Sequence, residues 1–528
     1  MNKKFIAGSF WLSFGSIFSR AVGVAYLIPW LGMMGSNQNA NTAQALFNVA
    51  YTPYALFIAL GTAGFPSAIA RGVSEYNGIE NYYESKKLFY LGFVFMVITG
   101  ILSGFILYSI APLLASTSPV LSKTNGIMAI RAVVPAMVIL PSMSIVRGWF
   151  QGNQELSYFG VSQIFEQVAR IIFILLSTYL VISIFHQSFI LAVYFSVFGS
   201  FVGALISYIY LVKAYTRNKI EFPNIQVGLK DMYHSRRIFI RLVVQSLPFV
   251  FVGSGITIMQ LIDQLFFKSI MLSTHHFNAA DVQQIYTLFS ANPNKITTVI
   301  ISIALSISET SLPLLASEFR HPTKIKKLLE QNISYLLFLL LPIAIVACFL
   351  APEIYGLFFG FSQLGPKYLI WNILQSIILS MAINGLTVLQ APHQSKRALV
   401  YLGTGLIVKV VLQYPLVYVL GGYGAILATG ISFLITGVLC YRSILYRVKV
   451  ISRTIRRIIT CNLIYAAVLF IAHVTVGGLF NPTTKGYAFL LSSVIGVGAL
   501  TLYILIVDKL GVSYILFNRK LIFGKEKK

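Results

Sequence analysis

The sequence is poor in charged side chains, and poorest in acidic ones. Of 528 residues, 15 are Asp or Glu and 40 are Lys or Arg, so charged residues make up 10% of the chain. Water-soluble proteins carry about 25% charged residues, and this chain therefore cannot cover a soluble surface. Hydrophobic residues make up 57% of it, and the mean hydropathy is +0.79. The composition predicts a membrane protein. It argues against a nucleic-acid partner despite the net charge of +25, because the basic residues fall between apolar runs.

Cysteines and catalytic motifs are also scarce. The three cysteines, Cys348, Cys440 and Cys461, all lie in apolar stretches, which is not the pattern of a disulfide framework. The pair His275 and His276 has no carboxylate at ligand spacing, so no metal site is expected. The sequence has no glycine-rich phosphate-binding motif and no nucleophile constellation. We therefore expect neither a cofactor nor an enzymatic activity.

Long apolar runs dominate the chain instead. Fourteen of them are long enough to cross a bilayer, which takes about 20 residues, and they lack the strict alternation of barrel strands. In hydrocarbon only helices and closed barrels satisfy the backbone, so these runs predict transmembrane helices. Their approximate limits are 8–31, 43–69, 88–112, 124–149, 158–183, 188–214, 238–268, 282–316, 334–358, 367–391, 398–420, 423–443, 459–479 and 486–508.

The basic residues orient these helices. With the N-terminus placed inside, four of the 40 Lys and Arg residues fall in outer loops, five fall within spans, and all others lie in cytoplasmic segments. This bias is the positive-inside pattern of a multi-pass protein. The N-terminal stretch begins with basic residues like a signal peptide, but its apolar run is too long and shows no small-residue cleavage site. The sequence thus predicts an all-α integral membrane protein with fourteen transmembrane helices and both termini in the cytoplasm.

A basic segment at residues 215–237 divides the chain near its middle. It separates six predicted spans in residues 1–214 from six in residues 238–443, and residues 444–528 hold two additional helices and a basic tail. Because each half has an even number of spans, an axis along the membrane normal would relate the halves, as in parallel repeats. We therefore expect two six-helix lobes in pseudo-two-fold repeat, a cytoplasmic linker and a C-terminal pair of helices.

Two basic residues lie deep within predicted spans. Arg20 is midway along the first span and Lys295 a little less than halfway along the eighth, and neither has an acidic residue one helical turn away. A charge at a helix centre costs about 2.5–3.5 kcal/mol on insertion scales, so such residues usually face a water-filled cavity or a partner. We expect both side chains to line one central cavity and to bind an anionic substrate.

Glu166 and Arg170 lie in the fifth span, after a polar stretch that begins at Arg147. They are four residues apart, with the acidic residue first, which is the favourable order for an ion pair on one helix face. A structural brace is one interpretation of this pair, and a gating contact is another.

The other charged residues within or next to the spans also have competing interpretations. Arg131 can extend toward the outer headgroups, and Lys409 can take part in interhelical packing with a carbonyl group or Gln413. Asp263, toward the outer end of the seventh span, is a candidate counter-ion for one of the two deep cations. Arg71, Arg131 and Lys409 are further candidates for lining the cavity. Because bases outnumber acids, we expect the cavity to be net positive.

The stretch RGWFQGNQ, followed after a short gap by SQIFEQVAR, carries a family resemblance. It resembles the junction of the fourth and fifth spans in polysaccharide-type flippases of the MOP superfamily, in particular the Gram-positive branch of the MurJ-type lipid II flippases. GSIFSRAVG in the first span and ANPNKI in the eighth are similar as well, and the resemblance covers essentially the whole chain. It implies a V-shaped pair of lobes around a cationic cavity that opens alternately to each side of a bacterial cytoplasmic membrane. It also implies that the last two helices help to form a groove for a polyprenyl tail.

The resemblance implies roles for individual residues too. Arg20 matches a span-one arginine that the family uses near the substrate diphosphate, whereas a second arginine of the Gram-negative type is replaced here by Tyr26. The Asp-Arg of the eighth span is absent, and Lys295 is the expected substitute. The sodium-site residues of some members are not evident in the eleventh span. Glu166 and Arg170 are expected to latch the lobe near its inner gate rather than to touch the substrate.

The implied function is that of a flippase for lipid II, an undecaprenyl-diphosphate-linked peptidoglycan precursor. Its partners would be this lipid-linked diphosphate glycan and the membrane lipids. The membrane potential or a counter-ion would drive transport, and the protein would be a monomer. An alternative cargo is another lipid-linked glycan of the capsule or teichoic-acid type. A MATE-like drug antiporter would favour acids over bases in the cavity, and a membrane glycosyltransferase would need acidic or metal-binding residues on a sizeable outer loop.

Overall fold

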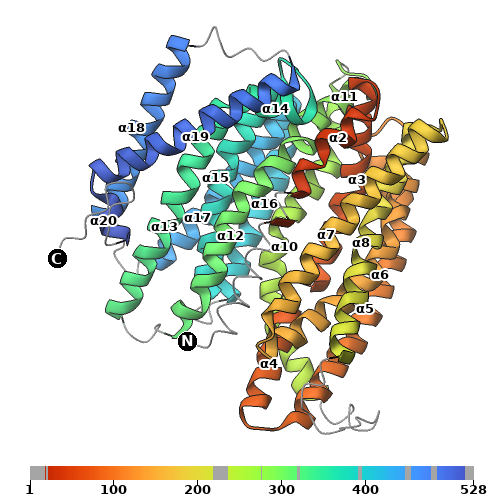
Figure 1. Ribbon diagram of the computed structural model, residues 1–528, viewed down its shortest axis with the longest axis vertical. Helices are drawn as coiled ribbons and strands as arrows, with labels where there is room; N and C mark the ends of the chain where they lie inside the picture. Colours follow the sequence, from red (N-terminus) through yellow and green to blue (C-terminus); the bar gives the residue numbers. More distant parts are fainter. Residues whose placement is uncertain are drawn as a thin grey trace. The chain divides into compact units, whose positions relative to one another are not determined.

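The computed structural model is all-helical (Figure 1). It describes residues 18–19, 22–62, 64–217, 236–274, 276–317, 322–390, 395–445, 453–476 and 484–517. The chain divides into two compact units, Met1–Gln284 and Ile285–Lys528. The first unit extends past the predicted linker at residues 215–237. The limits of the two six-helix lobes stay a prediction.

The first unit is a bundle of long helices. In Figure 1, α5, α6, α7 and α8 run side by side; α6 contacts both α5 and α8, and α7 packs along α8. Helix α10 packs against α3 and α5. The elements are α2 (Leu27–Gly32), α3 (Asn37–Thr62), α4 (Phe65–Gly78), α5 (Tyr82–Thr117), α6 (Lys123–Gly152), α7 (Leu156–Tyr179), its π-helical extension η1 (Leu180–Ile184), α8 (Phe189–Arg217), α10 (Arg236–Ser273) and α11 (Ala279–Tyr286).

Glycines bring neighbouring helices of this unit into close contact. A Cβ atom added at Gly203 on α8 would lie 2.5 Å from the backbone oxygen of Glu166 on α7. One added at Gly148 on α6 would lie 2.6 Å from the backbone oxygen of Pro66 on α4. In a membrane, where lipid tails are as apolar as leucine, such close backbone packing is a main source of helix association. These two glycines therefore set how α8 sits on α7 and how α6 sits on α4.

The second unit is also a helical bundle. Helix α15 packs against α12 and α17, α16 packs along α17, and α13 contacts α12 and α18. The elements are η2 (Thr287–Ala291), α12 (Pro293–Ser317), α13 (Pro322–Phe349), α14 (Ala351–Phe359), α15 (Gly365–Gln390), α16 (Ser395–Leu420), α17 (Gly422–Leu445), α18 (Arg453–Val476), α19 (Lys485–Lys509) and α20 (Val512–Phe517).

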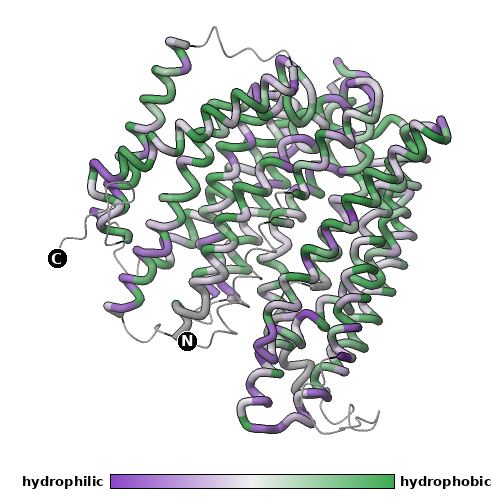
Figure 2. Tube along the Cα trace, in the orientation of Figure 1, coloured by the Kyte–Doolittle hydropathy of each residue, from purple (hydrophilic) through white to green (hydrophobic). Residues whose placement is uncertain are grey.

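Twelve of the described helices are long and apolar enough to cross a membrane, and each overlaps one of the fourteen predicted spans. Figure 2 shows hydrophobic residues along most of α5, α8 and α19, and hydrophilic ones on α4. Half of the predicted span at 8–31 lies outside the described residues, and its described C-terminal part is a shorter apolar helix, Val22–Gly32. The one at 282–316 is divided into α11, η2 and α12, because a π-helical turn and Pro293 interrupt it. The chain is an all-helical multi-pass membrane protein, and the count of fourteen stays a prediction.

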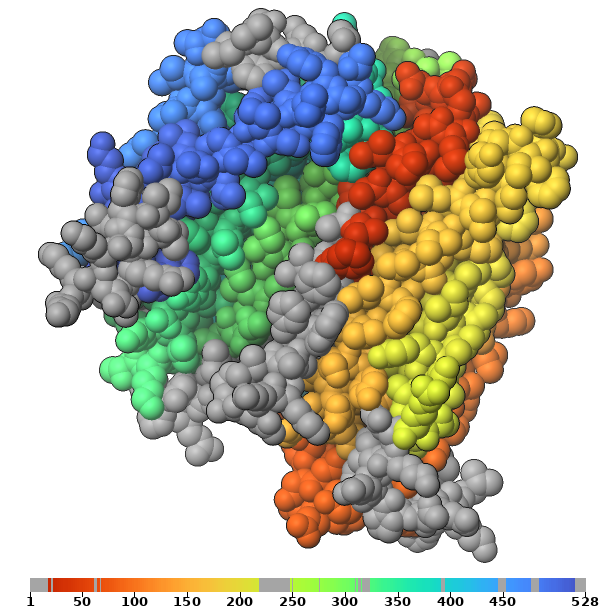
Figure 3. Space-filling model, in the orientation of Figure 1, coloured from red at the N-terminus to blue at the C-terminus, as the bar shows by residue number. Residues whose placement is uncertain are grey.

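Large apolar side chains point outward from many of these helices. Phe105 on α5 is 69% exposed and Val494 on α19 is 71% exposed. Figure 3 shows α19 lying obliquely over neighbouring helices of the second unit, where it contacts α13, α14 and α18. Such outward apolar faces would be unfavourable in water, but they match the hydrocarbon of a bilayer.

Candidate functional site

Three charged side chains form a cluster in the core of the first unit. Glu166 on α7 accepts hydrogen bonds through both carboxylate oxygens: Oε1 from Arg170, at 2.6 Å, and Oε2 from Arg147 on α6, at 2.9 Å. The side chains of Arg147, Glu166 and Arg170 are 12%, 16% and 14% exposed. Charge-assisted hydrogen bonds of this kind are stronger than neutral ones, and weak dielectric screening in a buried site strengthens them further. We call these three residues the charged cluster.

Arg147 is held on several sides. Its Nε donates to Ser162 Oγ at 2.9 Å, and its Nη2 donates to Ser207 Oγ on α8 at 3.0 Å. Its guanidinium also lies 5.6 Å from the ring centroid of Phe159. The Ser207 hydroxyl in turn donates to the Ser162 carbonyl oxygen at 2.8 Å. Arg147 therefore ties α6, α7 and α8 together at one level of the bundle.

Arg170 has a different environment. Glu166 is the one side chain with which it forms an ion pair in the described part of the chain, and its buried Nε has no hydrogen-bond partner there. Three tyrosines, Tyr26, Tyr51 and Tyr54, interact with it electrostatically. The ring centroids of Tyr51 and Tyr54 on α3 lie 5.3 Å apart. Arg170 thus has hydroxyl groups around it in addition to its acidic partner.

The expected pair between Glu166 and Arg170 is present, but Arg147, the second partner of the same carboxylate, was not predicted. Arg147 precedes Glu166 by 19 residues and lies on a different helix. No helical spacing rule connects the two positions. The only signal in the sequence was that an arginine begins the polar stretch that leads to Glu166.

The structure does not describe Arg20, which lies outside the described residues. Lys295 is near the start of α12 in the second unit, half-buried, and its backbone N–H donates to the Asn292 carbonyl oxygen at 3.1 Å. Asp263 is buried in α10 of the first unit. The pairing expected between Asp263 and one of the deep cations stays a prediction.

Lys409 is completely buried between α16 and α17. Its Nζ donates to the Ala425 carbonyl oxygen at 3.1 Å and to Thr429 Oγ1 at 2.7 Å. The expected contact with a carbonyl group is therefore present, on the neighbouring helix. The ammonium group serves to hold α16 against α17.

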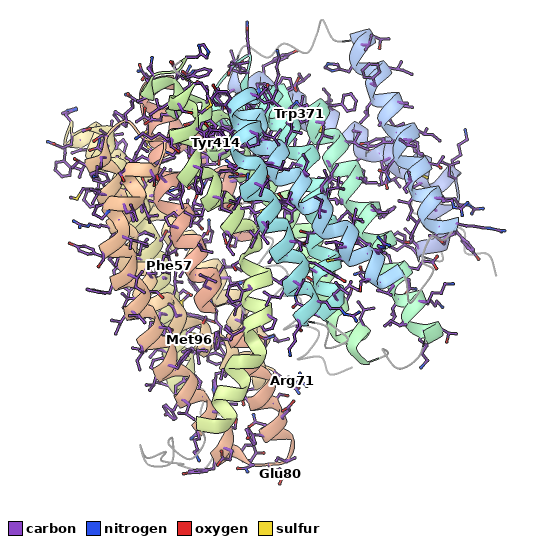
Figure 4. The ribbon with its side chains drawn as sticks, turned by 180° about the vertical axis from the view of Figure 1, so that it is seen from behind. Phe57, Arg71, Glu80, Met96, Trp371 and Tyr414 are labelled. Carbon is purple, nitrogen blue, oxygen red and sulfur yellow. The ribbon has the colours of Figure 1, made fainter. Side chains whose placement is uncertain are left out.

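Arg131 on α6 and Arg71 on α4 make contacts of their own outside the charged cluster. The guanidinium of Arg131 lies 4.1 Å from the ring centroid of Tyr108 on α5, a cation–π contact. Arg71 is on α4, near the end of the unit that also bears Glu80 (Figure 4). Its side chain is 76% exposed and pairs with Glu75 at 2.9 Å.

The charged cluster can bind charge, but it does not have the groups for acid–base or metal chemistry. Within the described ranges, no group of three or more His, Cys, Asp or Glu residues could hold a metal ion. Glu166 is fully engaged by two guanidiniums, which leaves it no free oxygen to act as a base toward a substrate.

Comparison with known proteins identifies the family of the chain. A model of the polysaccharide biosynthesis protein family matches residues 5–317. The chain is 33% identical over 453 residues to the lipid II flippase MurJ of Bacillus subtilis (strain 168), covering 82% of this chain and 81% of that protein.

Solved structures show the same fold. A lipid II flippase MurJ in an inward closed conformation superposes with a TM-score of 0.67 at 15% identity, covering 96% of this chain and 99% of that one. An inward-facing multidrug resistance MATE family transporter of the MOP superfamily superposes with a TM-score of 0.63 at 14% identity, covering 84% of this chain and 99% of that one. The chain belongs to the polysaccharide biosynthesis protein family, as a multi-pass membrane protein and a non-enzymatic homologue of the bacterial MurJ.

Proposed function

We propose that the protein is a flippase that moves lipid II, an undecaprenyl-diphosphate-linked peptidoglycan precursor, from the inner to the outer leaflet. The observation that carries the proposal is the 33% identity, over 82% of the chain, to a protein named as a lipid II flippase. The charged cluster supports it, because two guanidiniums share one carboxylate in the core of a membrane bundle. A net positive site of this kind favours an anionic cargo.

Transport of this cargo requires charge compensation rather than chemistry. A diphosphate headgroup cannot enter hydrocarbon unpaired, because burying an isolated charge is strongly unfavourable. Basic side chains replace its water with charge-assisted hydrogen bonds while the polyprenyl tail stays in lipid. In the proposed mechanism, Arg20 and Lys295 bind the diphosphate in a central cavity, and Asp263, Arg71, Arg131 and Lys409 are further candidates around it.

The proposed architecture has fourteen spans with both termini in the cytoplasm. Two six-helix lobes, residues 1–214 and 238–443, open alternately to each side, and residues 444–528 add the helices of the tail groove. The membrane potential favours outward movement of an anion: expelling two negative charges across 100 mV yields about 4–5 kcal/mol, at about 2.3 kcal/mol per charge. The potential or a counter-ion is the proposed driving force, and the protein acts as a monomer.

A second candidate cargo is another undecaprenyl-linked glycan of the capsule or teichoic-acid type. The match to a family described by polysaccharide biosynthesis favours it, and a diphosphate-binding site does not distinguish one glycan from another. A MATE-like drug antiporter is a weaker candidate. The similarity to MATE transporters is one of fold at 14% identity, and a drug cation would be repelled by a site in which bases outnumber acids.

Complementation separates the two glycan cargoes. The gene is introduced into a strain depleted of its lipid II flippase and, separately, into a strain that lacks a capsule-repeat flippase. We expect growth of the first strain to be restored, together with the amount of lipid II accessible at the outer surface, whereas capsule export in the second stays absent. Rescue of the capsule strain alone would establish the second cargo instead.

A further inference from the structure

The charged cluster contains one more positive charge than negative. Both oxygens of Glu166 accept a hydrogen bond, one from each arginine. Within residues 22–62, 64–217 and 236–274, the ion pairs of this cluster involve no second acid. A buried excess charge is unfavourable in a protein core unless a further partner compensates it. The two arginines differ in how far such a partner can reach them.

The guanidinium of Arg147 is already bound by several partners. Besides Glu166 it binds the hydroxyls of Ser162 and Ser207, and it lies against the ring of Phe159. These contacts come from α7 and α8 and fix the guanidinium on several sides. Arg147 therefore acts as the permanent counter-ion of Glu166.

The guanidinium of Arg170 can accept a further partner. A guanidinium has five N–H donors, and this one makes a single side-chain hydrogen bond, to Glu166, among the contacts of the described residues. Its Nε is buried and has no partner there. The side chain is nevertheless 14% exposed, so that a ligand can approach it from one side.

The surroundings of Arg170 suit a phosphate group. The hydroxyl-bearing rings of Tyr26, Tyr51 and Tyr54 are close enough to interact with it electrostatically. A tyrosine hydroxyl can donate a hydrogen bond to a phosphate oxygen, and a guanidinium can donate two in parallel. Tyr51 is itself half-buried rather than enclosed. Tyr51 and Tyr54 on α3 are thus near enough to Arg170 on α7 to add hydroxyl donors to its guanidinium.

We propose that Arg170 is a substrate-binding residue that, with the hydroxyl of Tyr51, holds a phosphate oxygen of the cargo, whereas Arg147 remains the counter-ion of Glu166. This inference rests on the proposed function, since it adds a contact to the same diphosphate. It differs from the interpretation of the pair as a brace, in which Arg170 has no role beyond packing. The ligand chemistry is that of a phosphate group, which the lipid-linked diphosphate and free pyrophosphate share.

The test is a direct binding titration of the purified full-length protein in nanodiscs of neutral lipid. Three probes are compared: undecaprenyl diphosphate, undecaprenol, which lacks phosphate, and inorganic pyrophosphate. The variants are Arg170→Gln, Arg170→Lys, Tyr51→Phe and Glu166→Gln. Arg217→Gln is the matched control, because Arg217 is an exposed arginine at the end of α8. The apparent unfolding temperature of each variant is measured in parallel.

Arg170→Gln is expected to weaken binding of undecaprenyl diphosphate about tenfold or more, since one charge-assisted contact is lost. The fold should persist, because the remaining Arg147–Glu166 pair is neutral. Arg170→Lys restores part of the affinity by retaining the charge. Tyr51→Phe weakens binding by a smaller factor, and Arg217→Gln leaves it unchanged.

Glu166→Gln distinguishes substrate binding from bracing. Without the carboxylate, Arg170 has no competing anion, so this variant binds pyrophosphate more tightly although it unfolds at a lower temperature. If Arg170 served only as a brace, Glu166→Gln would lower both the affinity for pyrophosphate and the unfolding temperature. Unchanged affinity in both Arg170→Gln and Glu166→Gln would overturn the inference, and so would equal binding of undecaprenol and undecaprenyl diphosphate by the wild-type protein.

The same titration separates this inference from the proposed function. If the wild-type protein binds undecaprenyl diphosphate and Arg170→Gln binds it equally well, the role of Arg170 is refuted and the flippase proposal stands. If Arg170-dependent binding is found for pyrophosphate but not for the lipid, the anion site stands and the flippase proposal fails. Binding of neither phosphate probe by the wild-type protein refutes both.

Discussion

Arg147 Nη2 and Glu166 Oε2 lie 2.9 Å apart, although one residue is near the end of α6 and the other is on α7. The two helices enclose the tight turn around Asn153 and Gln154, where Gln154 adopts a positive φ of 61°. The polar stretch of the sequence is thus a turn that folds the arginine back onto the acid. The same acid binds Arg170 one helical turn further along α7.

Replacing Glu166 by Gln is expected to destabilise the protein strongly. Two buried guanidiniums would then have no carboxylate between them, and removing one partner of a buried ion pair costs about 3–5 kcal/mol. The apparent unfolding temperature in detergent measures the effect. Arg147→Gln should be less harmful, because one cation and one anion remain. The exposed pair of Arg71 and Glu75 provides the control, since Glu75→Gln should change stability by less than about 1 kcal/mol.

Replacing Gly203 by Ala should push α8 away from α7. The added Cβ would meet the Glu166 backbone oxygen at 2.5 Å and the Arg170 Cβ at 2.9 Å, neither of which can give way without moving a helix. Overpacking of this kind costs about 1–3 kcal/mol. The unfolding temperature should fall, whereas Gly498→Ala on α19, where the new Cβ meets nothing within 4 Å, should leave it unchanged or raise it. Equal effects of the two substitutions would contradict the close packing at Gly203.

Thr429→Val should destabilise the second unit through Lys409. The substitution removes the hydroxyl that accepts a hydrogen bond from the buried ammonium at 2.7 Å, and removing one acceptor of a buried charged donor costs about 1–3 kcal/mol. The double variant Lys409→Met, Thr429→Val should recover much of that loss, because no charge then needs compensation. Additive effects in the double variant would show that the contact does not couple the two side chains.

Arg20→Ala should abolish complementation of a strain depleted of its lipid II flippase. The proposed mechanism uses this residue to compensate the diphosphate charge within the membrane. Membrane insertion, followed by the amount of protein in the membrane fraction, should be unaffected. Normal growth of the strain with this variant would refute the role of Arg20.

Charge reversal at Lys295 should impair transport more than neutralisation does. In the proposed site, Lys295→Glu repels the diphosphate, whereas Lys295→Gln removes one favourable contact. The amount of lipid II that becomes accessible at the outer surface measures the difference. Equal losses in the two variants would indicate that Lys295 acts through packing on α12.

Local features of the helices could be predicted well. Twelve apolar runs overlap described helices that could cross a membrane, because a run of about 20 apolar residues has no other stable conformation in hydrocarbon. The pair of Glu166 and Arg170 was also predictable, since residues four apart share a helix face. The division of the eighth run was not expected. Its π-helical turn at Thr287–Ala291 depends on how the helix packs, which a hydropathy profile does not contain.

The sequence by itself determined the solvent of this protein, the identity of most of its helices and the excess of basic over acidic residues, because these follow from composition and from local periodicity. Only the tertiary structure decided which charges meet. Arg147 reaches Glu166 from another helix, Arg131 turns to the ring of Tyr108, and Lys409 binds the backbone and a hydroxyl of α17. The physical reason is that a buried charge must be compensated by whatever group the packing of the helices brings within hydrogen-bond distance, and that neighbour need not be near in sequence.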